Sequence, residues 1–210
     1  MEVAQETVRQ PTARAISKMK TKEGVLRAAR ELFSTQEYES VTTRGVAEKA
    51  GMSTGAMFAN FENKADLFAA VLGQAVEERR KLIEISMEEA EDSAEEALLA
   101  IFSAAYTFHY EQRTLSSSLM AALWMRYPDE VLARATSEMR KQDSLFIHQA
   151  LWKGAEKGKF HAKLALDMDL VADTLHALLL SQQFLCMAGH TLAIHKVHAQ
   201  IKLVLGTLSK

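Results

Sequence analysis

The chain contains little cysteine, proline or glycine. Its 210 residues include one cysteine, Cys186, two prolines, Pro11 and Pro128, and nine glycines. A single thiol cannot form a disulfide within the chain, and its isolation favours a reducing compartment. Because 48% of the residues are hydrophobic while turn formers are scarce, we predict a globular all-α protein rather than one built on sheets.

Long uncharged apolar runs are also missing. A membrane-spanning helix needs about 20 apolar residues, and the longest candidate, Thr174–Ala188, is shorter and carries His176, Gln182 and Gln183. We interpret this stretch as a buried helix. Met1 is not followed by a charged and then apolar leader. The sequence therefore predicts a cytoplasmic protein without a membrane partner.

Motifs for catalysis, cofactors or metals are absent. The sequence has no Gly-rich phosphate loop, Ser/His/Asp arrangement or HExxH, so we predict no enzyme, no catalytic residue and no cofactor. His195 and His198 could share a helical face, but no carboxylate or cysteine joins them at ligand spacing. We expect them on a terminal, solvent-facing surface and predict no metal site. The acidic run 84–96 lacks the glycine of a calcium loop and fits a solvated helix face.

Charge is distributed unevenly along the chain, although the formal net charge is only −2. Residues 9–30 hold seven basic side chains and one acid, whereas residues 84–96 hold seven acids and no base. A basic segment and an acidic segment in one chain suit different binding partners. We predict residues 1–20 to form a flexible basic arm. This arm is either an ordinary solvated tail or a contact to the minor groove of DNA.

Hydrophobic periodicity begins at Thr21 and predicts three helices up to residue 66. The first carries Val25, Leu26, Ala29, Leu32 and Phe33 on one face. Thr42 or Thr43 can cap a second helix that ends at Gly51, and Ser53 or Thr54 can cap a short third helix. Two short helices separated by a glycine-containing turn, behind a longer first helix, form a helix-turn-helix unit. Residues 21–66 are thus predicted to form a small helix-turn-helix domain, and helical hairpins of this kind either bind DNA or are plain structure.

Residues 67–210 are predicted to form a larger bundle of about six helices. Asn63 can cap a long helix, and Ser93 with Glu96 offers a capping box for the next. Pro128 suits a helix start, while Gly158 and Gly189 suit helix ends. Further helices are expected over 116–126, 128–158, 168–188 and 191–208. With the first domain, this gives about nine helices.

The segment from Val25 to Phe68 resembles the DNA-binding domain of the TetR family. It contains Val-Leu-Arg-Ala-Ala-Arg-Glu-Leu-Phe (25–33), Tyr38, and Val-Thr-Thr-Arg-Gly-Val-Ala-Glu-Lys-Ala-Gly-Met-Ser-Thr-Gly-Ala-Met-Phe-Ala-Asn-Phe-Glu-Asn-Lys-Ala-Asp-Leu-Phe (41–68). A weaker similarity lies in Gly154-Ala-Glu-Lys-Gly158-Lys-Phe160. The resemblance implies a dimeric repressor that binds double-stranded operator DNA and is released by a small-molecule effector of unknown identity.

The resemblance also implies DNA-binding positions. A B-DNA major groove is about 12 Å wide and admits one helix, which small residues allow to approach closely. Phe58 stands where the family usually has tyrosine, so a hydroxyl for phosphate is missing, and Glu37 stands where glycine is common. Lys64 is either a phosphate contact or a solvated lysine. The predicted set is Thr42, Thr43 and Arg44 in the bracing helix, Ser53, Thr54, Gly55 and Ala56 at the groove, and Phe58, Asn60 and Lys64 along phosphates.

Effector binding is predicted between the bundle helices, where aromatic and methionine side chains suit adaptable apolar pockets. The alternative is that these residues are ordinary core. The last two helices carry broad apolar faces, which the resemblance implies form a homodimer interface and which could instead be a monomer's core. The candidate effector-binding residues are Phe102, Tyr106, His109, Met120, Trp124, Phe146 and Gln149.

Two other functions remain open at this stage. A small helical enzyme or carrier would have a cluster of perturbed ionisable groups in its bundle, and the sequence shows none. An activator or a nucleoid-type structural binder would keep the DNA contact. A short palindromic footprint favours regulation, whereas sequence-insensitive coating of DNA favours the structural role.

Overall fold

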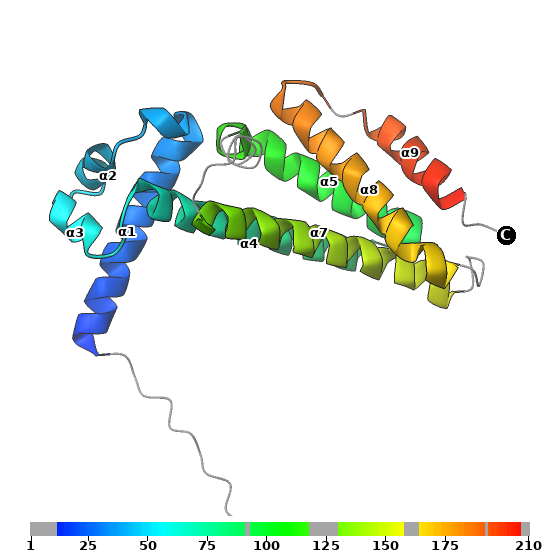
Figure 1. The fold of residues 1–210 in the computed structure, drawn as a ribbon, viewed down its shortest axis with the longest axis horizontal. Helices are drawn as coiled ribbons and strands as arrows, with labels where there is room; N and C mark the ends of the chain where they lie inside the picture. The colour runs from blue at the N-terminus through cyan, green and yellow to red at the C-terminus, as the bar shows by residue number, and fades with distance from the viewer. Residues whose placement is uncertain (1–11, 91–92, 118–129, 158–163, 192, 207–210) are drawn as a thin grey trace, which may run out of the picture.

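A computed structural model describes residues 12–90, 93–117, 130–157, 164–191 and 193–206. All regular elements in these ranges are helical, which confirms the all-α prediction. Figure 1 shows two parts: α1 to α3 at one end, and a bundle made by α4, α5, α7, α8 and α9. The predicted segment 116–126 lies mostly outside the described residues, as does the end of the 154–160 turn.

The N-terminal part contains α1 (Ala13–Thr35), the short 3-10 helix η1 (Tyr38–Ser40), α2 (Thr43–Lys49) and α3 (Thr54–Phe58). α1 begins at Ala13, eight residues before the predicted start at Thr21. Residues 13–20 have no apolar period, and the side chains described among them, 17–20, are exposed. Alanine, arginine, lysine and methionine nevertheless favour helix, so they extend a helix that is anchored further along. The predicted arm of residues 1–20 is therefore helical in its second part.

Side-chain caps fix where the short helices begin. The backbone N–H of Gly45 donates to Thr42 Oγ1 at 3.0 Å, and that of Ala56 donates to Ser53 Oγ at 3.2 Å. α2 ends where Gly51 adopts a φ of +67°. The Met52 N–H then bonds the Ala47 carbonyl at 2.9 Å, a Schellman closure that glycine permits without strain. The predicted caps and the Gly51 stop are thus confirmed.

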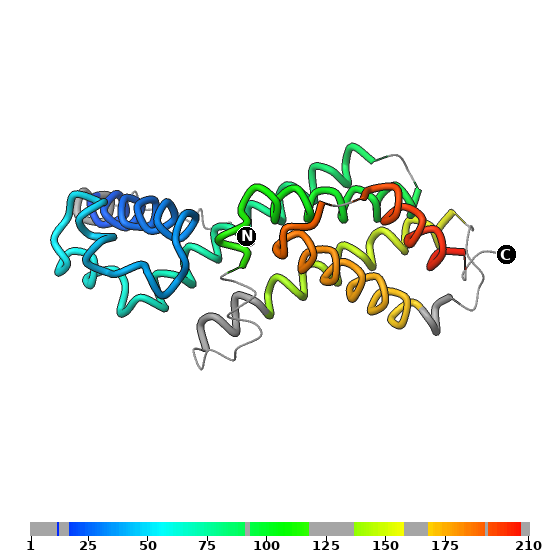
Figure 2. Tube along the Cα trace, turned by 90° about the horizontal axis from the view of Figure 1, so that it is seen from above, coloured from blue at the N-terminus to red at the C-terminus, as the bar shows by residue number. Residues whose placement is uncertain are grey.

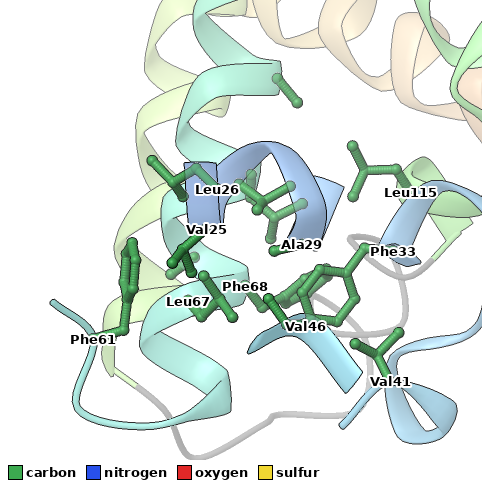
Figure 3. Close-up of a cluster of buried hydrophobic side chains, with 14 of the residues drawn as sticks. Val25, Leu26, Ala29, Phe33, Val41, Val46, Phe61, Leu67, Phe68 and Leu115 are labelled. Atoms are coloured by element: carbon green, nitrogen blue, oxygen red, sulfur yellow. The ribbon is translucent and has the colours of Figure 1, made fainter. Parts of the chain in front are cut away.

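One hydrophobic cluster holds α1, α2 and α3 together (Figure 3). Val25, Ala29 and Phe33 of α1 are fully buried. They pack with Val46 of α2 and Met57 of α3, at the start of α4 (Lys64–Glu89). We call this the N-terminal cluster. It also includes Phe108, Leu115 and Met139 from the bundle part of the chain.

The bundle continues from α4 through α5 (Ala94–Glu111), α7 (Glu130–Glu156), α8 (Leu164–Met187) and α9 (Ile194–Gly206). α4 packs on α5 and α7, while α5 also contacts α7, α8 and α9. Figure 2 shows these helices side by side, with α4 leading from the N-terminal part into the bundle. A second cluster, here called the bundle cluster, fills their interior from Ile83 and Phe102 to Leu175 and Ile201.

α4 belongs to both parts of the molecule. Asn63 caps it by accepting from the Asp66 N–H at 2.8 Å, and its 26 residues make a rod of about 39 Å. Its first half, including Leu67, Phe68 and Val76, lies in the N-terminal cluster, and its second half, from Ile83, lies in the bundle cluster. A boundary after residue 66 therefore divides the sequence but not the core.

α8 is buried on one face only, which corrects the interpretation of 174–188 as a buried helix. Within the described residues, the stretch Met168–Met187 is long and apolar enough to cross a membrane, judged by length and composition alone. Leu175 and Leu179 pack in the bundle cluster, whereas Leu170 is 68% and Phe184 53% exposed. Periodicity reveals an apolar surface but cannot tell which atoms cover it.

Candidate nucleic-acid interface and sensing domain

The short helix α3 is held by its buried side and presents its other side to solvent. Met57 is fully buried against the N-terminal cluster. The α2–α3 connection is short because Gly51 reverses the chain at once. This arrangement leaves the beginning of α3, from Ser53 to Ala56, projecting from the core. It has the form by which a helix-turn-helix offers the N-terminal end of its second helix to a groove.

All ten residues predicted to contact DNA lie at the surface. Six are exposed, and the other four are half-buried; none is fully buried. They come from three elements that the caps and the N-terminal cluster hold in a fixed arrangement. The exposed six are Thr42, Arg44, Ser53, Thr54, Gly55 and Phe58, and the half-buried four are Thr43, Ala56, Asn60 and Lys64.

Gly55 has no packing reason to be glycine. It lies within α3, and a Cβ built there would meet only the Ser53 hydroxyl, at 3.9 Å. Glycine in a helix is about 0.8–1.0 kcal/mol less favourable than alanine. The chain's own packing thus gains nothing from Gly55. Without a Cβ at residue 55, the backbone at the start of α3 stays open to close approach from outside the chain.

Phe58 and Asn60 lie at the end of α3 and differ in their surroundings. The Phe58 ring is 49% exposed, although phenylalanine is usually buried. The Asn60 amide nitrogen donates to the Ala56 carbonyl at 3.0 Å, while its Oδ1 is buried without a described partner. Asn60 therefore secures the helix end, and the Phe58 ring stands free beside it.

Lys64, the first residue of α4, is held against the 3-10 helix η1. Its ammonium lies 4.2 Å from the centroid of the Tyr38 ring and donates to the Glu39 carbonyl at 3.3 Å. Burial lowers the pKa of this ammonium. The Tyr38 ring in turn packs on Phe68, with centroids 4.8 Å apart. Lys64 is thus positioned by a cation–π contact rather than solvated freely.

Ion pairs tie the N-terminal helices to each other and to α4. Arg30 of α1 forms a two-pronged pair with Glu78 of α4, in which Nη2 and Oε2 are 2.5 Å apart. Lys49 of α2 lies 2.8 Å from Glu31 of α1. Forked Arg–carboxylate geometry is specific in direction. These pairs join α1 to α2 and to α4 at the surface of the N-terminal part.

The structure separates the predicted effector-binding residues into several environments. Phe102 lies in the bundle cluster with 2% of its surface exposed, and half-buried Tyr106 stacks on Tyr110. His109 is 1% exposed, and its Nδ1 lies 2.9 Å from the Ser116 hydroxyl. Met120 and Trp124 lie outside the described residues. The remaining two, Phe146 and Gln149, line an open groove.

This groove runs between α4 and α7 and has a volume of about 980 Å³. Its apolar floor comes from Met87, Phe146 and Met168, while the rim carries carboxylates and a few cations. Leu145 and Trp152, both 56% exposed, also line it. The sequence suggested Phe146 and Gln149 but not the acidic rim formed by Glu84, Glu88 and Glu138.

A buried set of polar side chains crosses the bundle, and most of it was not predicted from the sequence. Arg79 of α4 pairs with Asp143 of α7 at 2.5 Å, with side chains 1% and 0% exposed. His176 Nε2 of α8 lies 3.9 Å from the second Asp143 oxygen. Burial and the nearby Arg79 charge lower the pKa of His109 to about 3. We call Arg79, His109, Asp143 and His176 the polar layer.

Several polar atoms of this layer have no hydrogen-bond partner among the described residues. They include Arg79 Nε and Nη2, Asp143 Oδ2, and Nε2 of both histidines. An unsatisfied buried polar atom costs about 1–3 kcal/mol. The enzyme hypothesis predicted a cluster of perturbed ionisable groups, and the polar layer is such a cluster. The Ser116 hydroxyl lies 2.9 Å from His109 Nδ1, but both side chains are buried and the lowered pKa of His109 makes its imidazole a weak base.

The sequence did contain a signal for the polar layer. Arg79 falls three residues after Val76 and four before Ile83, at a position where α4 otherwise buries apolar side chains. Asp143 interrupts the buried series Met139, Phe146 and Ile147 in the same manner. A charge on the apolar side of an amphipathic helix is a stronger indication of a site than an aromatic residue there.

The two histidines considered for metal binding lie in different surroundings. His195 is exposed, as expected. His198 instead pairs with Glu95 of α5, which also lies 3.3 Å from the Lys202 ammonium. Among the described residues no group of three or more His, Cys, Asp or Glu side chains is arranged to hold a metal ion. His198 thus helps to attach α9 to α5.

Comparison with known sequences supports the assignment of the N-terminal part. The family described as bacterial regulatory proteins, tetR family, matches residues 25–71. An uncharacterized HTH-type transcriptional regulator of Bacillus subtilis (strain 168), YvkB, is 38% identical over 64 residues. That match covers 30% of this chain and 34% of the relative, so it concerns the DNA-binding domain alone.

Comparison with solved structures concerns the whole fold. A TetR transcription regulator from Haloarcula marismortui has a TM-score of 0.73 at 17% identity, covering 91% of this chain and 100% of that one. The fatty acid degradation regulator FadR from Bacillus halodurans has a TM-score of 0.64 at 19% identity, with 94% and 97% covered. A tetR-family regulatory protein from Rhodococcus RHA1 has a TM-score of 0.64 at 21% identity, with 90% and 97% covered.

The fold and the exposed end of α3 define a helix-turn-helix protein with a helical second domain. Within it, residues 25–71 are the segment that matches the tetR family of bacterial regulatory proteins.

Proposed function

We propose that this protein is a dimeric, sequence-specific transcriptional repressor that leaves its operator when a small molecule binds to its bundle. The observation that carries the proposal is the projecting start of α3, where Gly55 has no role in the chain's own packing. The neighbouring Thr54 and Arg44 side chains are exposed. Together they supply a close backbone approach and donors for a DNA groove.

Dimerisation through α8 and α9 is supported by their uncovered apolar surface. Leu170, Phe184 and Leu185 of α8 are 68%, 53% and 40% exposed, and Ile194 and Leu203 of α9 are 45% and 74% exposed. Exposed large apolar side chains gathered on adjacent helices mark an interaction surface. A second copy is the partner that this face fits, because an operator with two half-sites requires two recognition helices.

Release by an effector is supported by the path of α4. α4 carries Glu78, which pairs with Arg30 of α1, and the next residue, Arg79, which belongs to the polar layer. A ligand that displaces α4 therefore also displaces the recognition helices. Two recognition helices fit one face of DNA only when they lie about 34–36 Å apart, so a modest rotation takes them out of register. Regulation in this form needs no chemistry on the ligand, and we propose a non-enzymatic protein acting in the cytoplasm.

Selection from a random pool of double-stranded DNA tests the proposal, using the full chain. We expect an inverted repeat whose half-sites lie about one helical turn apart, or a multiple of it. A template with this repeat between promoter and reporter should show reduced transcription in vitro. Recovery of unrelated sequences would favour a structural DNA-coating role, and increased transcription would favour an activator.

Mutation of the α3 surface then identifies the contacts. Bulky replacements of Thr54 and Ala56 should abolish enrichment of the repeat while leaving the dimer intact in size-exclusion chromatography. Lys64→Ala should weaken binding to all DNA alike and reduce the salt slope by about one unit. An unchanged operator affinity in the Thr54 and Ala56 variants would contradict the placement of α3.

A further inference from the structure

The polar layer separates the two hydrophobic clusters of the protein. On α4, Val76 belongs to the N-terminal cluster and Ile83 to the bundle cluster, and Arg79 lies between them. On α7, Asp143 lies in the same manner between Met139 and Phe146. Two charged side chains that are 1% and 0% exposed thus occupy the junction between the DNA-binding part and the sensing part.

The layer offers more hydrogen-bond donors than its described residues use. A guanidinium carries five N–H groups, and only Nη1 of Arg79 meets the Asp143 carboxylate, at 2.5 Å. Nε and Nη2 of Arg79 are buried without a described partner. Gln183, further along the buried face of α8, is in the same condition at both its amide atoms. Unused donors in an enclosed place call for acceptor oxygens that the described residues do not supply.

The charges of the layer balance. Arg79 is matched by Asp143. Burial lowers the pKa of both His109 and His176, which favours their neutral forms. A balanced layer does not attract a cation, because its carboxylate is already paired. Its spare capacity lies on the donor nitrogens of Arg79, which suit a carbonyl or carboxylate oxygen.

The surroundings of the layer are apolar on both sides. Phe108 and Met139 stand on the N-terminal side, and Ile83, Phe102 and Phe146 on the bundle side. A ligand that reaches Arg79 must therefore place the rest of its surface among hydrocarbon and aromatic groups. This combination describes an amphiphile with an oxygen acceptor at its polar end.

We propose that the effector is an apolar molecule with a carbonyl or carboxylate end, that Arg79 binds this end, and that binding loosens the Arg79–Asp143 link between α4 and α7. The inference rests on the proposed function, because it names the ligand class and the switch of that regulator. An acceptor oxygen that bonds Nε or Nη2 of Arg79 pulls the guanidinium away from its Nη1 bond to Asp143. The helix that carries the DNA-binding part is thereby released from α7 at the point where the two clusters meet.

Matched ten-carbon probes test the ligand class. Decanoate, decanamide and decylammonium share one apolar body and present an anionic acceptor, a neutral carbonyl and a cationic donor. We expect calorimetric titration of the free full-length protein, below the micelle concentration, to show binding of at least one of the first two. Decylammonium should bind at least tenfold more weakly. Equal binding of the amine, or no binding by any probe, would overturn the proposal.

Variants on α4 and α7 test the site. Arg79→Met combined with Asp143→Leu removes both charges and replaces them with apolar side chains, which proteins tolerate at buried ion pairs. This double variant should lose at least tenfold in affinity for the probe. The control, Arg80→Met with Glu84→Leu, removes the neighbouring pair that faces the groove. Retained probe binding in the first variant, or loss in the control alone, would place the ligand elsewhere.

The same samples separate the two proposals. Operator binding without ligand is measured by gel shift, and its absence would refute the repressor while leaving the probe titration valid. Operator binding that persists in the presence of a bound probe would leave the site intact but refute the loosening of α4. If protein that binds its operator titrates no probe, the effector class is wrong and the repressor stands.

Discussion

Arg79 and Asp143 lie on different helices, 64 residues apart in the chain, and join at 2.5 Å with almost no exposed surface. Charges removed from water are stable only while they remain paired, and a well-packed apolar pair is often as stable. The pair therefore specifies how α4 and α7 fit together, and its contribution to stability depends on which partner is changed.

We predict that Arg79→Met destabilises the protein by about 3–5 kcal/mol, because it leaves the Asp143 carboxylate buried and unpaired. The double replacement Arg79→Met with Asp143→Leu should recover most of this loss. Urea unfolding at one fixed protein concentration measures both free energies. A single variant as stable as wild type would show that Asp143 is not held as a charged group.

Gly55→Ala should separate folding from DNA binding. A Cβ at residue 55 meets only Ser53 Oγ at 3.9 Å, so the variant should be as stable as wild type or more stable by about 0.5–1 kcal/mol. Operator affinity should fall at least tenfold if DNA approaches the α3 backbone. The matched control is Gly73→Ala, where the added Cβ has no neighbour within 4 Å. It should stabilise α4 without affecting DNA, and equal DNA binding by both variants would contradict the close approach.

Phe58→Tyr should strengthen DNA binding by about 0.5–1.5 kcal/mol by adding a hydroxyl that can bond a phosphate. The ring is 49% exposed, so the hydroxyl needs no space within the core, and thermal stability should not change. Fluorescence anisotropy with operator and with unrelated DNA is the measurement. Because a phosphate contact carries no sequence information, the gain should be similar for both. A gain confined to the operator would indicate a base contact instead.

Acid should destabilise the protein partly through His109. The pKa of this imidazole is lowered from 6.5 to about 3 by burial and by Arg79, so below pH 6.5 the unfolded chain binds a proton that the folded chain does not. Its contribution to stability is complete above pH 6.5 and is lost as the pH falls toward 3. His109→Gln should reduce the slope of unfolding free energy between pH 6 and 4 by up to about 1.4 kcal/mol per pH unit. His195→Gln, at an exposed position, is the control, and an equal change there would refute the assignment.

Local sequence signals predicted the DNA-binding part well. Thr42, Ser53 and Asn63 cap the helices that spacing indicated, because a cap depends on residues within one turn. The start of α1 was predicted too late because an exposed helical extension has no apolar period. The residues named around α3 lie at the surface, and their contact with DNA stays a prediction.

The sensing part was less predictable because its site depends on contacts between distant helices. Phe102, His109 and Gln149 were chosen for residue type, yet the first lies in the core, the second in the polar layer and the third beside the groove. The pairing of Arg79 with Asp143 requires knowing which faces of α4 and α7 meet. Periodicity shows which face of each helix is apolar, but it does not show how the helices are rotated relative to one another in the bundle.

The N-terminal cluster includes Phe108, Leu115 and Met139, which come from far beyond the helix-turn-helix in the chain. The protein is therefore not modular in the way that its sequence suggests. A chimaeric regulator made by exchanging residues 21–66 would pack a foreign DNA-binding domain against Phe108, Leu115 and Met139, which fit the native domain. We expect the proposed release of DNA by an effector to survive only in exchanges that keep these three contacts or transfer them together with the domain. An exchange of the DNA-binding part alone therefore also changes what Phe108, Leu115 and Met139 pack against.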